Sequence, residues 1–365
     1  MAEALAAPQG RSGRPGGRGA AGSTHFAALD LGTNNCRLLI AAPTQRGFRI
    51  VDAYSRIVRL GEGLSQSGRL SEAAMERALA ALKICADKVR RYEPVRLRAI
   101  ATQACRSAEN GLEFLARVEE HTGIALNIIT PHEEAQLSVA GCSNLIDPEA
   151  DAALVLDVGG GSTELAWLDL RHTRAGRGVP PIAAWLSIPI GVVTLAERFP
   201  EVAGANEAWF RAMVETIRAP IASFAAADPL RDLFEAGRSH LIGTSGAITS
   251  LAGLHLGLPR YDRSKVDGLW MTRGDCETVR ARLAALTTRE RAAQPCIGPD
   301  RADLVLAGAA ILKAVQELWP CERVRVADRG LREGLLLSLM TEKPKRRRRR
   351  RRGRPGAALP AAGAA

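Results

Sequence analysis

Two short segments constrain the fold of this 365-residue chain more than any other feature. Residues 26–29 and 153–156 are apolar runs, and each leads into an aspartate, Asp30 or Asp157, and then into a glycine-containing turn. Short apolar runs that are bounded by turn residues are typical of buried strands. Each segment therefore predicts a strand that ends in a carboxylate beside a tight, polar loop.

The two loops have the composition of phosphate-binding loops. Their members are Gly32, Thr33, Asn34 and Asn35 in the first loop and Gly159, Gly160, Gly161, Ser162 and Thr163 in the second. Glycine permits positive φ and close approach, so successive N–H groups can curl around an anion. The loops lack both the dinucleotide-binding fingerprint and the closing Gly-Lys-Ser/Thr of a P-loop. One such loop is often only a tight turn, but two similar copies favour a shared phosphate ligand.

The aspartates at the strand ends predict a metal ion. Asp30 and Asp157 would repel a bound phosphate unless a divalent cation lay between the two groups. We expect Mg²⁺ as the cofactor, and other divalent cations would accept the same oxygen ligands. The residues after each loop, 36–40 and 163–168, are apolar enough to return as second strands, so each loop is expected to join a hairpin.

The formal charge of +11 resembles that of a nucleic-acid-binding protein, but this charge is not spread along the chain. Residues 343–365 hold ten Lys or Arg and no acid, and residues 1–22 hold three Arg and one Glu. Removing these contributions of +10 and +2 leaves about −1 for the rest of the chain. The basicity therefore belongs to the ends, which are low in complexity and are expected to be disordered tails at 1–22 and 341–365.

Between these tails, strand and helix patterns alternate twice. The first half predicts a helix from a Ser71 cap to Tyr92, a strand at 95–101, a helix at 109–121 and a strand at 126–130. Further elements are expected at 153–157, 163–168, 182–188, 191–199, 205–226, 240–243, 247–256, 274–288, 301–318 and 323–327, followed by a closing helix after Gly330. Because both halves open with a strand, a loop and a returning strand, we expect duplicated α/β domains that face a cleft.

No apolar run reaches the length of a membrane span, and the N-terminus lacks the apolar core of a signal peptide. The seven cysteines form neither CxxC pairs nor the spacing of a disulfide framework. These features predict a soluble protein of a reducing compartment, which is the cytoplasm, with no membrane partner.

Additional motifs resemble the exopolyphosphatase and guanosine pentaphosphate phosphohydrolase (Ppx/GppA) family. Besides the two loops, they are Thr130-Pro131-His132-Glu133-Glu134-Ala135, Ser187-Ile188-Pro189-Ile190-Gly191-Val192-Val193, Gly243-Thr244-Ser245-Gly246, Pro299-Asp300-Arg301-Ala302-Asp303 and Gly330-Leu331-Arg332-Glu333-Gly334. The resemblance covers about residues 25 to 340. It implies two actin-like (ribonuclease H-like) domains of the sugar kinase, heat-shock chaperone and actin superfamily, at 23–148 and 149–340, with an interdomain cleft. The chain resembles the short, two-domain form of the family.

The resemblance also implies roles for individual residues. Glu134 matches the catalytic glutamate that activates water, with Glu133 as the alternative base. Asp157 and Glu164 match acidic positions around the metal, and Asp30 occupies the equivalent strand end in the first half. Arg106 resembles a phosphate-contacting arginine, a role that suits its forked guanidinium.

The implied activity is hydrolysis of a terminal phosphoanhydride by in-line attack of water. The first hypothesis is an exopolyphosphatase that acts on inorganic polyphosphate, and the alternative is removal of the γ-phosphate of guanosine pentaphosphate (pppGpp). A phosphotransferase or ATPase of the same superfamily and a polyanion-binding module are weaker alternatives. The basic tail at 343–354 is expected to contact polyphosphate or RNA weakly. A homodimer is expected from the family alone.

Overall fold

The computed structural model of the protein describes residues 24–45, 47–93, 95–171, 178–201 and 206–341. The expected tail at 1–22 and nearly all of that at 341–365 lie outside the described residues. Thr341 is described, and it ends the last helix. No helix in the described part of the chain has the length and apolarity that a bilayer crossing requires.

The first sheet has the strand order β3-β2-β1-β4-β5. These strands span Gly47–Ile57 (β3), Asn35–Thr44 (β2), His25–Leu31 (β1), Val95–Ala101 (β4) and Asn127–Ile128 (β5). The three strands β1, β2 and β3 form an antiparallel meander, whereas β4 and β5 continue parallel to β1. The end of β1 therefore lies at the centre of the sheet, where it carries Asp30.

The second sheet repeats this arrangement. Its order is β10-β11-β9-β6-β7-β8, with bounds Trp270–Thr272 (β10), Arg323–Ala327 (β11), Ser239–Thr244 (β9), Ala152–Val158 (β6), Thr163–Asp169 (β7) and Ile182–Ile188 (β8). The strands β6, β7 and β8 form the antiparallel meander, and β9 and β11 continue parallel to β6. The expected half-to-half duplication is thus present in the topology, with β6 in the place of β1.

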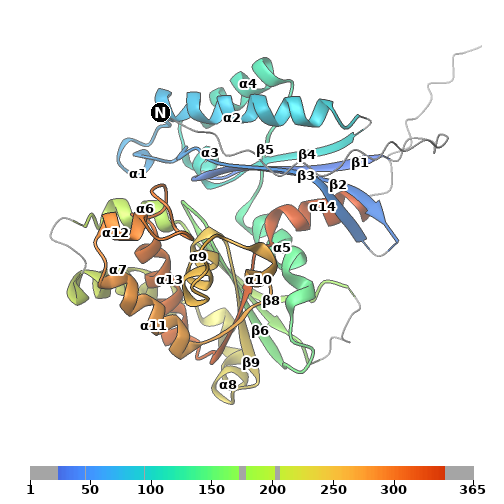
Figure 1. The fold of residues 1–365 in the computed structure, drawn as a ribbon. Helices are drawn as coiled ribbons and strands as arrows, with labels where there is room; N and C mark the ends of the chain where they lie inside the picture. The colour runs from blue at the N-terminus through green and yellow to red at the C-terminus, as the bar shows by residue number, and fades with distance from the viewer. Residues whose placement is uncertain (1–23, 46, 94, 172–177, 202–205, 342–365) are drawn as a thin grey trace, which may run out of the picture.

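Helices cover both faces of each sheet (Figure 1). In chain order they are α1 (Leu64–Ser67), α2 (Glu72–Arg90), α3 (Gln103–Ser107), α4 (Gly111–Thr122), α5 (Pro131–Cys142), α6 (Val192–Arg198), α7 (Glu207–Ala222), α8 (Arg231–Glu235), α9 (Gly246–His255), α10 (Arg263–Val266), α11 (Arg273–Ala284), α12 (Thr288–Ala292), α13 (Val305–Leu318) and α14 (Leu331–Thr341). Short 3₁₀ turns occupy Ser143–Leu145 and Ala225–Leu230. Ser71 caps α2 as predicted, because its hydroxyl accepts a hydrogen bond from the N–H of Ala74.

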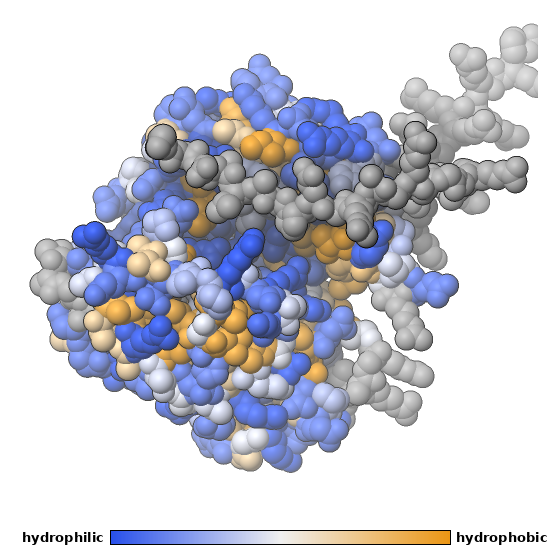
Figure 2. All heavy atoms as spheres, in the orientation of Figure 1, coloured by the Kyte–Doolittle hydropathy of each residue, from blue (hydrophilic) through white to orange (hydrophobic). Residues whose placement is uncertain are grey.

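Each domain has its own hydrophobic core. In the first domain, apolar residues of α2 and α4 pack on one face of the sheet, with Phe114 and Leu82 fully buried among them. In the second domain, α6, α7, α9, α11 and α13 contribute to a larger core around Trp167. In the face shown in Figure 2, hydrophilic residues cover most of the outer layer of the first domain, and hydrophobic residues are visible over the second.

Helices α5 and α14 lie side by side in the layer between the two sheets (Figure 1). The apolar residues Leu335 and Leu336 of α14 pack with Leu39 of β2 and Leu137 of α5. The closing helix therefore joins the first sheet, although the sequence placed it with residues 149–340. Its leucines are buried by a surface that is distant in the sequence, so no local pattern indicates this partner.

Three predicted elements coincide with observed ones, at 95–101, 182–188 and 323–327. The predicted helix at 301–318 is shorter, because residues 301–304 form a turn and α13 begins at Val305. Strand β3 was not predicted, since its half-buried and exposed residues follow no regular alternation. The predicted boundary at 148/149 falls between the last strand of the first sheet and the first strand of the second.

Candidate active site

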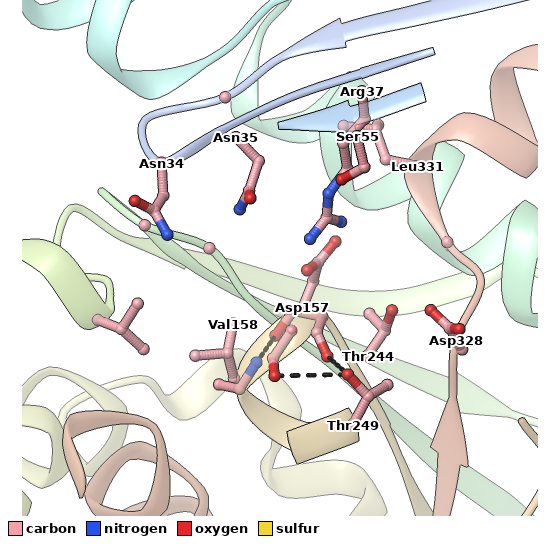
Figure 3. A pocket seen from close by; sticks show the side chains of 18 of the residues that line it. Asn34, Asn35, Arg37, Ser55, Asp157, Val158, Thr244, Thr249, Asp328 and Leu331 are labelled. Atoms are coloured by element: carbon pink, nitrogen blue, oxygen red, sulfur yellow. Dashed lines mark hydrogen bonds between the residues drawn. The ribbon is translucent and has the colours of Figure 1, made fainter. Parts of the chain in front are cut away.

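A cavity of about 510 Å³ lies between the two domains, and both predicted loops line it. Its lining includes the predicted residues Asp30, Gly32, Thr33, Asn34, Asn35, Glu134, Asp157, Gly159, Gly160, Gly161 and Ser162. Figure 3 shows Asn34, Asn35 and Arg37 on one side of this cavity and Asp157 facing them from the other. The fold thus brings together segments that are more than 120 residues apart in the sequence.

The two loops have the same backbone geometry. The N–H of Gly32 donates to the carbonyl of Asn35 at 2.8 Å, and the N–H of Gly159 donates to the carbonyl of Ser162 at 2.9 Å. Each bond closes a tight turn between paired strands, as the sequence predicted. Thr163, the last residue assigned to the second loop, is fully buried and donates its hydroxyl to the carbonyl of Ile190 at 2.7 Å. It does not line the cavity.

The tips of the two loops touch across the interdomain boundary. A Cβ atom added to Gly161 would lie 2.6 Å from Oγ1 of Thr33, and one added to Gly160 would lie 3.0 Å from Cβ of Asn34. The glycines of the second loop therefore have a steric role that the sequence did not reveal, which is to let the first loop approach.

Four carboxylates gather near the second loop. Burial raises the pKa of Asp30 to about 6, and the neighbouring Arg37 and Arg332 oppose this shift. Burial also raises the pKa of Asp157, although a hydroxyl hydrogen bond from Ser138 at 2.5 Å partly compensates. The pKa of Glu164 rises to about 7 through burial and then through the charge of Asp157, which lies opposite it in the β6–β7 pairing.

Glu134 is the fourth of these carboxylates, and it begins α5. Thr130 caps this helix by accepting a hydrogen bond from the N–H of Glu133, and Pro131 occupies the first turn, where a missing N–H costs nothing. Glu134 is 7% exposed and lines the cavity. Burial, followed by the charge of Glu164, raises its pKa well above 4.5. A carboxylate whose pKa is raised in this way is a stronger base than an ordinary glutamate.

Glu133, the alternative base, has a different environment. Its carboxylate pairs with Arg98, whose guanidinium also donates to Ser338 of α14. Glu133 does not line the cavity. The geometry therefore favours Glu134 over Glu133 for chemistry in the cleft.

Arg106 lies behind Glu134 and outside the cavity lining. Its guanidinium donates to the carbonyl of Ile129 at 2.6 Å and to Oε1 of Gln103 at 2.7 Å. Both terminal nitrogens also approach Oε2 of Glu134 at 3.4 Å. In this structure Arg106 orients Glu134 and opposes the rise in the pKa of its carboxyl.

The carboxylates fit a divalent cation with few protein ligands. Among the described residues, no group of three or more His, Cys, Asp or Glu side chains is close enough to hold a metal. However, Oδ1 of Asp30 is buried without a hydrogen-bond partner, and its carboxyl and those of Asp157, Glu164 and Glu134 are desolvated together. Mg²⁺ commonly takes one or two carboxylates and completes its shell with water and phosphate oxygens.

Five arginines also line the cavity, and the sequence did not assign them a role. Arg37, Arg263, Arg301, Arg329 and Arg332 all line it. Burial, followed by the charge of Arg37, lowers the pKa of Arg301 and that of Arg332. Such crowding of cations in a buried wall indicates an anionic ligand. Arg301 and Arg332 lie within recognised motifs, which was the only signal that could have identified them.

The chain matches known proteins over most of its length. The model of the Ppx/GppA phosphatase family matches residues 39–343. Exopolyphosphatase 2 of Mycobacterium tuberculosis is 31% identical over 337 residues, which cover 87% of this chain and 98% of the relative.

Solved structures agree with this match. An exopolyphosphatase from Cytophaga hutchinsonii superposes with a TM-score of 0.75 at 25% identity, over 87% of this chain and 98% of that one. A Ppx/GppA family member from Aquifex aeolicus gives a TM-score of 0.68 at 29% identity, over 87% and 97%. The resemblance drawn from the motifs is confirmed, and so is the predicted α/β class, with one mixed sheet in each domain.

Proposed function

The chain belongs to the Ppx/GppA phosphatase family, a family of phosphoanhydride hydrolases, and from that premise we propose that its substrate is inorganic polyphosphate. The observation that carries this proposal is the number of arginines in the cavity. Five arginines line it together with the two loops, and Arg37 and Arg332 lie close enough to Asp30 to oppose the rise in the pKa of its carboxyl. A linear polyanion whose terminal phosphate lies at the loops matches this lining.

The base in this proposal is Glu134. Its carboxylate accepts a proton from a water molecule while the water oxygen attacks the terminal phosphorus in line. The bond from that phosphorus to the bridging oxygen breaks, and the shortened chain leaves with the negative charge on that oxygen. Arg106 keeps Glu134 oriented through its contacts at 3.4 Å.

The two loops and the arginines bind the substrate. The side chains of Thr33, Asn34 and Asn35 line the cavity, and each has a buried oxygen without a hydrogen-bond partner. The hydroxyl of Thr33 and the amide nitrogens of Asn34 and Asn35 can donate to phosphate oxygens. Arg37, Arg301 and Arg332 pair with the following phosphates, where the forked guanidinium suits two oxygens at once.

The carboxylates of Asp30 and Asp157 would hold a divalent cation, with Glu164 behind them. When bound, such a cation neutralises charge on the terminal phosphate and polarises it. Without a cation these desolvated carboxylates would repel the substrate, which is why we propose Mg²⁺ as the cofactor.

The basic segment 343–354 extends the proposal beyond the cleft, although it lies outside the described residues. Its positive charges would gather long polyphosphate near the enzyme in a salt-dependent manner. Removal of residues 343–365 should raise the KM for long chains at low salt and leave that for tripolyphosphate unchanged. Equal KM values in the two forms would refute this role.

We also propose a cytoplasmic homodimer. The seven cysteines are all buried and free, which suits a reducing compartment. Cell fractionation tests the location, and sedimentation of the purified chain tests the dimer.

One assay tests the proposed substrate. The full chain with Mg²⁺ is given long polyphosphate, tripolyphosphate, pppGpp or ATP, and release of orthophosphate is followed. We expect the highest kcat/KM with long polyphosphate. A higher kcat/KM with pppGpp would make pppGpp the preferred substrate in place of polyphosphate. A higher value with ATP would favour an ATPase.

A further inference from the structure

A segment of the first domain ties the two loops together from behind. This bridging segment, Val58 to Ser65, follows β3 and includes the start of α1. The N–H groups of Val58 and Arg59 donate to the carbonyl of Asn34 at 2.9 and 3.1 Å, and that of Gly61 donates to the carbonyl of Thr33 at 2.9 Å. The backbone of the first loop is therefore held by the bridging segment.

The bridging segment is in turn held by the second domain. Glu197, near the end of α6, accepts the N–H of Gly63 at 2.8 Å and the hydroxyl of Ser65 at 2.7 Å. A carboxylate that takes two hydrogen bonds with different oxygens fixes both the position and the direction of its partner.

An ion pair supports the same junction. Arg59 donates to Oδ1 of Asp303 at 3.1 Å and to the carbonyl of Asp300 at 3.2 Å. Arg59 also has a φ of 45°, which a residue with a Cβ adopts only when its surroundings require it. The local cost of this backbone is offset by the contacts that its side chain and N–H make.

Helix α6 connects the bridging segment to the second loop, because it also holds that loop. The N–H of Val192 donates to the carbonyl of Gly159 at 3.0 Å, and that of Val193 donates to the carbonyl of Gly160 at 2.8 Å. One end of this short helix thus fixes the second loop, and the other end, through Glu197, fixes the segment behind the first loop. The loop tips then meet at Thr33 and Gly161.

We propose that Glu197 is a positioning residue for phosphate hydrolysis, which sets the spacing of the two loops without touching the substrate. This inference rests on the proposed function of the loops, namely that both contact the terminal phosphate. Loss of the carboxylate frees the bridging segment from α6, so the first loop no longer has a fixed place opposite the second. A displacement of about 1 Å in such a site can cost 10²-fold in rate.

The kinetic test uses the full chain with Mg²⁺ and polyphosphate. We expect Glu197→Ala to lower kcat about 10-fold or more. Glu197→Gln should recover part of this loss, because its amide oxygen still accepts the N–H of Gly63. Ser65→Ala should add little to Glu197→Ala, since both changes break the same contact. The control is Glu215→Ala, which removes a surface ion pair with Arg218 on α7 and should leave kcat unchanged.

A second measurement does not depend on activity. Because all seven native cysteines are buried, spin labels can be attached at Cys residues introduced for the exposed Ala80 of α2 and Ala219 of α7. The distribution of distances between these labels should be wider in Glu197→Ala than in the parent and in Glu215→Ala.

The outcomes separate the two claims. An unchanged kcat in Glu197→Ala overturns the positioning role, even if the melting temperature falls. A parent chain that releases no phosphate from any polyphosphate refutes the proposed function instead. In that case the label distances alone decide the positioning claim, and equal distributions in parent and variant overturn it.

Discussion

The hairpins β1–β2 and β6–β7 occupy equivalent places in the two sheets, and their loops are closed by the same hydrogen bond. They differ in the residue that lies opposite the aspartate at the end of the first strand. Asp30 pairs with Arg37, whereas Asp157 pairs with Glu164. One duplicated frame therefore places a carboxylate opposite a guanidinium in the first domain and two carboxylates opposite each other in the second.

The loops differ in their side chains as well. The first presents Thr33, Asn34 and Asn35, and the second presents backbone from Gly159 to Gly161. The first hairpin is thus suited to orient an anion through side-chain donors and a guanidinium. The second is suited to hold positive charge and to let another backbone approach. The two hairpins therefore share a scaffold, and the residue opposite each aspartate together with the loop side chains divides the chemistry between them.

The largest expected effect concerns the base, which this comparison associates with the second hairpin. Glu164 is the charge that most raises the pKa of Glu134. Glu134→Gln should lower kcat by about 10²- to 10⁴-fold, as expected for a lost general base. Steady-state release of phosphate from polyphosphate measures it, and Glu133→Gln is the matched control, because Glu133 faces Arg98 outside the cavity.

The pH dependence of kcat refines this prediction. A base must be ionised, so kcat should fall as the pH drops through the pKa of Glu134, which lies well above 4.5. The acid limb of the pH profile is the range in which kcat falls. Glu164→Gln removes a neighbouring negative charge and should move this limb to lower pH. Arg37→Ala should move it less, since the charges that most shift the pKa of Glu134 are those of Glu164, Arg106, Asp157 and Asp30. A limb that moves with Arg37 and not with Glu164 would contradict the assignment.

The next effect compares one glycine from each loop. A methyl group at Gly161 would collide with Thr33, whereas one at Gly32 would have no atom closer than 3.5 Å. Gly161→Ala should therefore separate the loops and lower kcat by about 10- to 100-fold. Gly32→Ala should lower kcat by less than about a tenth as much, because these distances leave room for the methyl group. Equal losses would mean that the loops do not meet in the active enzyme.

A smaller effect is expected from the cation of the first hairpin. Arg37→Ala should raise the KM for polyphosphate by about 10-fold, the loss of one charge-assisted hydrogen bond, with a lesser change in kcat. Arg211→Ala is the control, because Arg211 pairs with Glu317 and does not line the cavity. A fall in kcat with an unchanged KM would place Arg37 at the reacting phosphate instead.

The sequence predicted the parts of this site that have a local signature. Asp30 and Asp157 end apolar runs before glycine, and that pattern indicates a strand end wherever the chain folds. Glu134 was identified through its match to a family motif. In each case a few neighbouring residues decide the local structure.

The rest of the site depends on packing between distant segments. Arg301 and Arg332 approach Arg37 only because a turn before α13 and the start of α14 meet the first hairpin. A surface arginine and a cavity arginine have the same local sequence signal. Likewise, the steric role of Gly161 depends on Thr33, which is 128 positions away in the sequence. A single sequence cannot report such pairs, because no neighbouring residue encodes them.

The smallest effect concerns the stability of the fold, which a buried and ionised aspartate lowers. Burial raises the pKa of Asp30 from 3.8 to about 6, so its contribution to stability is present below about pH 4 and is lost as the pH rises through 6. At pH 8 without divalent cations, Asp30→Asn should therefore raise the melting temperature by roughly 3–6 °C. Asp157→Asn should gain less, because the hydroxyl of Ser138 already compensates the charge of Asp157.

Added Mg²⁺ should stabilise the parent more than Asp30→Asn, since the cation then neutralises the charge of the Asp30 carboxylate. Melting curves at pH 5 and pH 8 measure all three forms, and a gain for Asp30→Asn that is as large at pH 5 as at pH 8 would show that ionisation of Asp30 is not its source.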